Sequence, residues 1–232
     1  MRKHGFTLAE VLVTLGIIGV VAALTTPALI QNVGNAKVGP KLQKAVATFE
    51  TASEMMLTEQ NSNSLMAVAS TSANLGKELG NYMKIVNNTS ATVANKKYDG
   101  TGEVIDQNHW QATRFDSDDG LIYYIHVGSK VSPHSDYADI PNNQLIGDIW
   151  IDINGPDGPN RTGKDLFKFA LYNDGTLRPW GGKGFLRHKT ASELHSSMWS
   201  STGGSACNKN HVSNGQTCAG SIFDNGMKII YQ

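Results

Sequence analysis

The sequence lacks an excess of charge of either sign. Its 232 residues include 20 lysines and arginines against 20 aspartates and glutamates, so the formal charge is zero. A protein that binds nucleic acid needs a basic surface to neutralise phosphates, so a balanced chain argues against that class. The composition also gives no sign of a polybasic patch for an anionic membrane.

Signatures of catalysis are missing as well. The sequence contains no G-x-S-x-G, Walker loop, H-E-x-x-H or C-x-x-C motif. One group of residues near one another in sequence includes metal-ligating types: His126, His134, Asp136 and Asp139. Neighbouring prolines favour a polar loop there over a metal site. We therefore expect a protein without enzymatic activity.

Charge is absent over one long stretch near the N-terminus. After Glu10 no charged residue appears before Lys37, and residues 6–30 are mostly apolar. About 20 apolar residues in a helix span a hydrocarbon core of roughly 30 Å. We therefore expect a membrane-spanning helix over residues 6–30, with Arg2 and Lys3 on the cytoplasmic side. Hydropathy alone favours a cleaved signal peptide or a plain single-pass anchor.

Glu10 argues against both a signal peptide and a plain anchor. A carboxylate inside a bilayer is costly, and neither a signal peptide nor a plain anchor has a use for one. The segment Gly5-Phe6-Thr7-Leu8-Ala9-Glu10, which follows a short basic leader and opens an apolar helix, resembles the class III signal of type IV prepilins and type II secretion pseudopilins. Pro27 corresponds to a further landmark of that signal.

The resemblance implies that residues 1–5 are a leader. A prepilin peptidase on the cytoplasmic face would cut between Gly5 and Phe6 and methylate the new Phe6 amine. Glu10 would pair with the Phe6 amine of a neighbouring subunit, which lowers the cost of burying both charges in an apolar bundle. The helix would be locally unwound near Pro27.

The resemblance also implies partners and a location. The partners would be copies of this chain, or other pilins and pseudopilins, together with the peptidase and an inner-membrane assembly platform. The chain would begin as a single-pass protein of a bacterial inner membrane and end in a periplasmic pseudopilus or a cell-surface pilus.

Residues 31–60 are expected to continue the helix. An apolar stripe on one face is predicted by the steps of three and four between Leu42, Val46, Phe49, Ala52 or Ser53, and Met56. Gly39-Pro40 interrupts the pattern and predicts a bend or a fresh helical start. The second half of this helix would pack its stripe against a globular head over residues 61–232.

The head is expected to be rich in β-structure. Residues 121–127, 147–153 and 164–172 alternate apolar and polar side chains, and Asn173-Asp174-Gly175 is a hairpin turn into residues 176–178. These segments predict an antiparallel meander of three or four strands with one face available to the helix. Residues 61–118 yield only a short helix around 72–86, and residues 222–231 suggest a turn and a last strand. The predicted fold class is α+β, a long N-terminal helical spine packed on an antiparallel sheet, which is also the architecture that the resemblance implies.

The loop between two of these strands is rich in oxygen ligands. It contains Asp152, Asn154, Asp157, Asn160, Thr162 and Asp165. Calcium takes six to eight oxygens from a flexible loop, so we consider a Ca²⁺ site at Asp152, Asn154, Asp157 and Asp165. The interpretation that the sequence favours is simpler, a turn-rich loop whose side chains cap their own backbone. No other cofactor is indicated.

Cysteine is scarce, with only Cys207 and Cys218 in the chain. Export to an oxidising compartment would favour a disulfide between them, and type IV pilins often have such a loop near the C-terminus. Two free thiols are the alternative.

Two functions from different classes follow. The first is a structural subunit of a type IV pilus or secretion pseudopilus. The second is an exported or membrane-anchored binding or enzymatic domain that uses an ordinary signal sequence.

Overall fold

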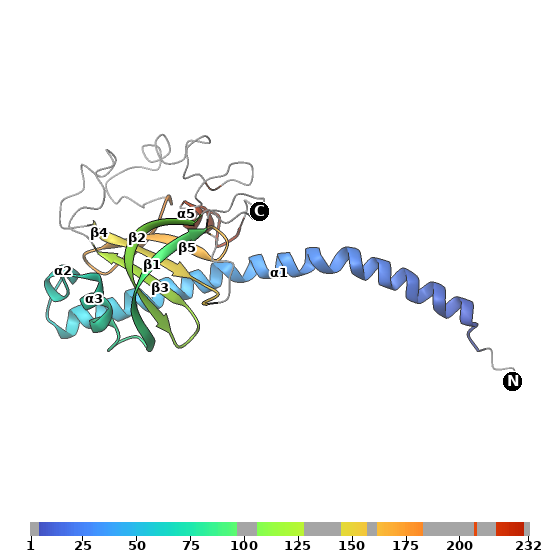
Figure 1. Cartoon of the computed structure of the whole chain (residues 1–232), viewed down its shortest axis with the longest axis horizontal. Helices are drawn as coiled ribbons and strands as arrows, with labels where there is room; N and C mark the ends of the chain where they lie inside the picture. The colour runs from blue at the N-terminus through green and yellow to red at the C-terminus, as the bar shows by residue number, and fades with distance from the viewer. Residues whose placement is uncertain are drawn as a thin grey trace. The chain divides into compact units, whose positions relative to one another are not determined.

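The chain forms two compact units, Met1–Lys37, here the N-terminal unit, and Val38–Gln232, here the head. The computed structural model describes residues 5–96, 106–127, 145–156, 162–182, 207 and 217–229. One long helix, α1 (Leu8–Glu59), supplies residues to both units (Figure 1). The fold is α+β, and it combines this apolar N-terminal helix with an antiparallel sheet.

The stripe predicted for the second part of α1 is confirmed. Leu42, Phe49 and Met56 are fully buried, and Val46 is 9% exposed. Val38, Ala45 and Ala52 extend the same face and join these residues in the main hydrophobic core. Steps of three and four place all of them on one side of the helix, so the head begins where this stripe begins.

Helical structure runs without interruption through Pro27 and through Gly39-Pro40. The fresh helical start expected at Gly39-Pro40 is therefore wrong. A Cβ on Gly39 would lie 2.1 Å from the carbonyl oxygen of Met227, so the missing side chain lets that turn approach the helix. The unwinding near Pro27 that the resemblance implies concerns an assembled filament, and it stays a prediction.

The head contains a six-stranded sheet, β1 (Ile85–Lys96), β2 (Asp106–Ser117), β3 (Ile122–Val127), β4 (Leu145–Asp152), β5 (Leu166–Tyr172) and β6 (Leu177–Pro179). The spatial order is β1-β2-β3-β4-β5-β6, and every pair is antiparallel. The four strands from β3 onward confirm the predicted meander. The turn at Asn173-Asp174-Gly175 is confirmed too, since Gly175 adopts φ 85° and its N–H donates to the carbonyl of Tyr172 at 3.0 Å.

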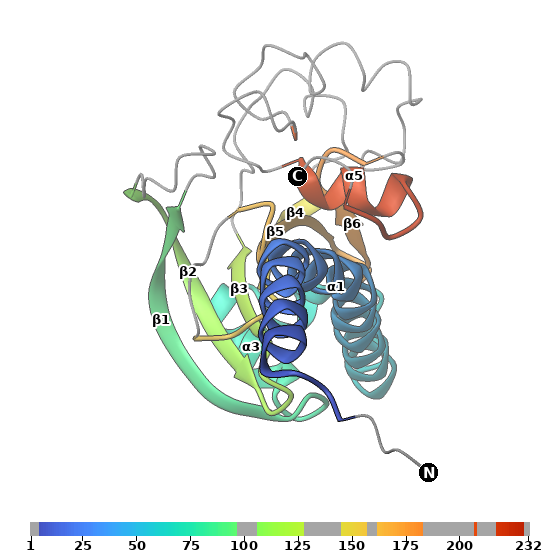
Figure 2. The ribbon, with the colours of Figure 1, turned by 90° about the vertical axis from the view of Figure 1, so that its right-hand side faces the viewer.

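Both faces of the central strands are buried. One face joins the stripe of α1 in the main core through Ile149, Ile151, Phe167, Phe169 and Leu171, and Figure 2 shows the sheet against the helix. The opposite face forms a second cluster, which contains Ala112, Ile122, Tyr124, Trp150 and Leu166. Strands β4 and β5 are therefore buried along their whole length.

The described part of the head also contains three short helices, α2, α3 and α5, of which the first two are capped by side chains. Ser64 caps α2 (Leu65–Val68), and Thr71 caps α3 (Ser72–Leu79) by accepting a hydrogen bond from the N–H of Asn74 at 3.2 Å. Helix α3 therefore ends earlier than the expected helix over 72–86, and β1 begins within that range.

Of the turn and last strand expected within residues 222–231, the turn is present at Asn225-Gly226, but residues 222–229, which the structure describes, contain no strand. Residues Cys218–Asp224 form helix α5. Ala219 and Ile222 lie three residues apart and are both fully buried, which is the spacing of one helical face.

Candidate functional site

The start of α1 is closed by a capping box. The backbone N–H and the hydroxyl of Thr7 both donate to Oε2 of Glu10, each at 2.8 Å. The N–H of Glu10 donates back to Oγ1 of Thr7 at 3.3 Å. Such reciprocal bonds satisfy donors that the first helical turn would leave unpaired. In the isolated chain, the carboxylate of Glu10 therefore has a partner within its own subunit.

The N-terminal unit leaves its apolar side chains uncovered. Phe6 is 90% exposed. The other large exposed apolar residues of this unit are Leu8, Val11, Leu12, Val13, Leu15, Ile17, Ile18, Val20, Val21, Leu24, Leu29, Ile30 and Val33. Helix α1 is long and apolar enough to cross a membrane. A surface of this kind is stable only in lipid or against other apolar helices, and Glu10 is the acidic residue within it.

The loop after β4 holds the first of two buried carboxyl groups. Asp152 is fully buried. Its Oδ1 accepts hydrogen bonds from the backbone N–H groups of Asn154 and Gly155, at 3.0 and 3.1 Å. Its Oδ2 is buried and has no hydrogen-bond partner within the described ranges. Burial, together with repulsion from Asp165, raises the pKa of Asp152 to about 7, because these effects outweigh the two hydrogen bonds.

The second carboxyl group, that of Asp165, belongs to the same loop. Asp165 is 5% exposed, and its Oδ2 accepts a hydrogen bond from Nδ2 of Asn154 at 3.2 Å. Asn154 therefore bridges the two acids. Thr162, which is 1% exposed, has a buried hydroxyl without a hydrogen-bond partner among the described residues. Three of the four residues considered for Ca²⁺ are thus brought together, and the fourth, Asp157, lies outside the described residues.

Backbone capping, the interpretation that the sequence favours for this loop, explains only some of its buried polar groups. The bonds to Oδ1 of Asp152 are the backbone caps that a turn-rich loop predicts. The uncompensated Oδ2 and the nearby second acid are not explained by capping, since a buried polar atom without a partner is costly. The sequence shows Thr162 only as one of several oxygen-bearing side chains, because its burial depends on tertiary structure.

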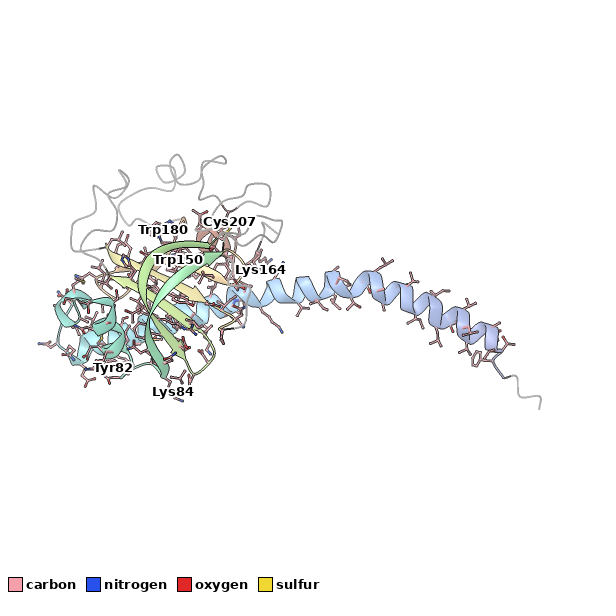
Figure 3. The ribbon with its side chains drawn as sticks, in the orientation of Figure 1. Tyr82, Lys84, Trp150, Lys164, Trp180 and Cys207 are labelled. Carbon is pink, nitrogen blue, oxygen red and sulfur yellow. A yellow bond between two sulfur atoms is a disulfide. The ribbon has the colours of Figure 1, made fainter. Side chains whose placement is uncertain are left out.

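Another buried charged group lies on the face of the sheet that is turned away from α1. Nζ of Lys168 is 3.8 Å from Oδ2 of Asp148, and each residue is 5% exposed. The ammonium lies 5.4 Å from the ring centroid of Trp150 and 3.8 Å from that of Trp180; both tryptophans are labelled in Figure 3. His126 is 3.4 Å from the other oxygen of Asp148. Burial lowers the pKa of Lys168 against the effect of Asp148. We interpret the group as a structural connection among β3, β4 and β5.

No three His, Cys, Asp or Glu side chains converge in the described part of the chain. The other residues of the His126 group considered in the sequence fall outside that part. Cys207 and Cys218 form a disulfide with Cα atoms 4.9 Å apart. Closing a loop of this length restricts the unfolded chain and contributes about 2–3 kcal/mol, which fastens α5 at its first residue.

Comparison with known families agrees with the chemistry of the N-terminal unit. Residues 1–26 match the model of the prokaryotic N-terminal methylation motif, which is the prepilin signal of type IV pilins and pseudopilins. No curated protein and no solved structure matches the chain. The matched residues include Gly5, Phe6 and Glu10, and together with the apolar helix they indicate membrane anchoring.

Proposed function

We propose that this chain is a structural subunit of a type IV pilus or type II secretion pseudopilus. A prepilin peptidase cuts it between Gly5 and Phe6 and methylates Phe6. The subunit is then anchored in the inner membrane until an assembly platform adds it to a filament in the periplasm or at the cell surface. The protein functions by polymerising and catalyses no reaction.

One observation supports this proposal above the others. A methylation motif at residues 1–26 opens a helix whose apolar side chains are exposed, and this surface contains a single acidic residue within its first turn. An exposed apolar surface requires partners, and copies of the same helix provide them. The carboxylate of Glu10 and a neighbour's Phe6 amine are each costly alone in that setting and compensate each other when paired.

The N-terminus of the mature protein tests the proposal. Protein from the native host is expected to begin at Phe6 and to be heavier than the unmodified peptide by one methyl group, as measured by mass spectrometry of the N-terminal peptide. Deletion of the prepilin peptidase is the control, and it should restore Met1–Gly5. A mature start near Leu24 would instead support an exported domain with an ordinary signal sequence, and an uncut Met1 in a strain with active peptidase would support a plain anchor.

We further propose that the loop between β4 and β5 binds Ca²⁺. The donor chemistry fits, because Asp152, Asn154, Thr162 and Asp165 present carboxylate, amide and hydroxyl oxygens, which hard cations prefer. The buried Oδ2 of Asp152 supports the fit, since a cation would compensate it. Bound Ca²⁺ would supply positive charge between two carboxyl groups that otherwise repel each other.

Thermal unfolding of the purified chain tests the cation site. At a Ca²⁺ concentration 100 times the Kd, binding contributes about 2.7 kcal/mol. For a protein of this size, we expect the Tm to rise by about 5–10 °C relative to the chelator-treated sample. Asp152→Asn should abolish the rise, and it should not lower the Tm in chelator, because it removes a buried charge. Asp118→Asn, which changes an exposed side chain near the same edge of the sheet, should keep the rise. Equal Tm values for the unmodified chain in Ca²⁺ and in chelator would contradict the site.

A further inference from the structure

Two lysines hold α1 to the sheet in the first turns of the head. Nζ of Lys41 donates to the carbonyl oxygen of Ile153 at 2.9 Å. Nζ of Lys44 donates to Oδ2 of Asp119 at 2.7 Å. Their partners lie in different loops, since Ile153 follows β4 and Asp119 lies in the turn between β2 and β3. The helix is thus attached at two points just after it enters the head at Val38.

The backbone of Ile153 is held by the loop between β4 and β5, here called the acidic loop, of which the structure describes residues 153–156 and 162–165. Ile153 directly follows Asp152, and its N–H donates to the backbone oxygen of Asp165 at 2.9 Å. Its side chain is 5% exposed and belongs to the same core cluster as Val38 and Leu42. The carbonyl that Lys41 contacts is therefore positioned by the two segments that contain the acids.

The turn between β2 and β3 contacts the loop after β4 at two glycines. Gly155, whose N–H is held by Asp152, adopts φ 72°, and a Cβ there would lie 2.7 Å from the carbonyl oxygen of Gly120. The acidic loop therefore packs directly on the turn that contains Asp119. Within that turn, the hydroxyl of Ser117 donates to Asp119. A shift of the loop at Gly155 would disturb the partner of Lys44 as well.

We propose that a cation bound by Asp152 and Asp165 fastens the first head turns of α1 through Lys41 and Lys44, so that the loop is a cation-dependent clamp on the helix. The clamp rests on the proposed Ca²⁺ site. With the cation bound, the two carboxyl groups attract a common charge and the described segments around Asp152 and Asp165 stay together. Without it, their repulsion favours separation of these two segments, which releases the carbonyl of Ile153 and loosens the turn around Asp119.

The clamp would act where the chain passes from its assembly helix to its head. An exposed ion pair contributes little alone, about 0.2–1 kcal/mol, and the side chain of Lys44 is 63% exposed. The attachment of these turns therefore requires ordered loops that present the partners of Lys41 and Lys44. A subunit that binds the cation would hold the start of its head segment firmly, and a subunit without it would open there locally.

Hydrogen exchange of the full mature chain in detergent micelles tests the clamp, with Ca²⁺ or chelator as the only difference. We expect the amides of residues 38–48 to exchange roughly tenfold more slowly with Ca²⁺, because exchange in a helix follows local opening. Residues 54–59, at the other end of α1, should change little. Lys41→Met should still show the Ca²⁺-dependent rise in Tm and should lose most of the exchange difference at 38–48. Lys77→Met, at an exposed lysine of α3, is the matched control and should behave like the unmodified chain.

The outcomes separate the clamp from the site on which it rests. A rise in Tm with unchanged exchange at residues 38–48 would overturn the clamp and leave the Ca²⁺ site intact. Neither a rise in Tm nor a change in exchange would overturn both. If Lys41→Met lowered the Tm but kept the full exchange difference, Lys41 would be an ordinary packing residue and the clamp would be wrong.

Discussion

A Glu10→Gln protein is expected to be cut and methylated normally and to form almost no filaments. Removing one partner of a buried ion pair costs about 3–5 kcal/mol, a factor of more than roughly 100 in the equilibrium constant of each subunit contact. The amide cannot compensate the positive charge of a neighbour's Phe6 amine, so that charge would remain unpaired in an apolar bundle.

The capping box makes this effect specific to charge. In the isolated chain, Oε2 of Glu10 accepts bonds from the N–H and the hydroxyl of Thr7. The amide oxygen of glutamine can accept the same bonds, so the start of α1 is preserved in the variant. If the proposed assembly is right, what the variant loses is a carboxylate that can exchange Thr7 for an ammonium on another subunit.

Filaments sheared from cells and quantified by immunoblot measure the effect, while mass spectrometry of the N-terminal peptide confirms processing. Glu54→Gln, at an exposed position of the same helix within the head, is the matched control and should assemble as the unmodified protein does. Wild-type amounts of filament from Glu10→Gln would show that the carboxylate is not needed for assembly.

Replacing Gly76 by leucine is expected to destabilise the head by about 3 kcal/mol. A Cβ at Gly76 would lie 1.5 Å from Cζ of Phe115, and the ring of Phe115 is 1% exposed in the main core. The ring has no free space to occupy, so α3 must move away from the sheet. Overpacking of this kind costs about 1–3 kcal/mol and sometimes more, and the overlap here begins with the first carbon of the side chain.

The Tm of the Gly76→Leu protein should fall by roughly 6–12 °C, as measured by circular dichroism. Lys77→Ala changes the next residue of the same helix at an exposed position and should shift stability by no more than about 0.5 kcal/mol. Because leucine is the better helix former, an effect of helix propensity alone would stabilise Gly76→Leu. A Tm at or above that of the unmodified chain would therefore contradict the close packing of α3 on β2.

The parts of the fold that could be predicted are those whose large apolar residues recur with a regular period. The apolar positions of α1 recur every three or four residues, and Ile149, Ile151 and Phe169 alternate along β4 and β5. Strands β1 and β2 lack such a signal. Val86, Asn87 and Asn88 are all exposed in β1, which lies at the edge of the sheet and has no reason to alternate. Helix α5 has two fully buried apolar side chains on its inner face, too few to outweigh the glycine and serine around them.

The candidate sites divide in the same way. Gly5, Phe6 and Glu10 lie within six consecutive residues, so their pattern is local and can be recognised without a structure. The loop between β4 and β5 shows its oxygen atoms in sequence but not their environment. Only the fold buries Asp152 completely and places Asn154 between it and Asp165. Lys41 and Lys44 carry no local signal, because their partners are contributed by loops far along the chain.

The order of the strands has a consequence for how the head forms. Each strand pairs only with its neighbours in sequence, from β1 through β6, so no strand has to wait for a segment made much later. Loops between successive partners are closed at small entropic cost, and such topologies fold quickly for sheets. A chain made from its N-terminus can therefore pair one strand after another as the strands appear, and α5 follows β6 in sequence.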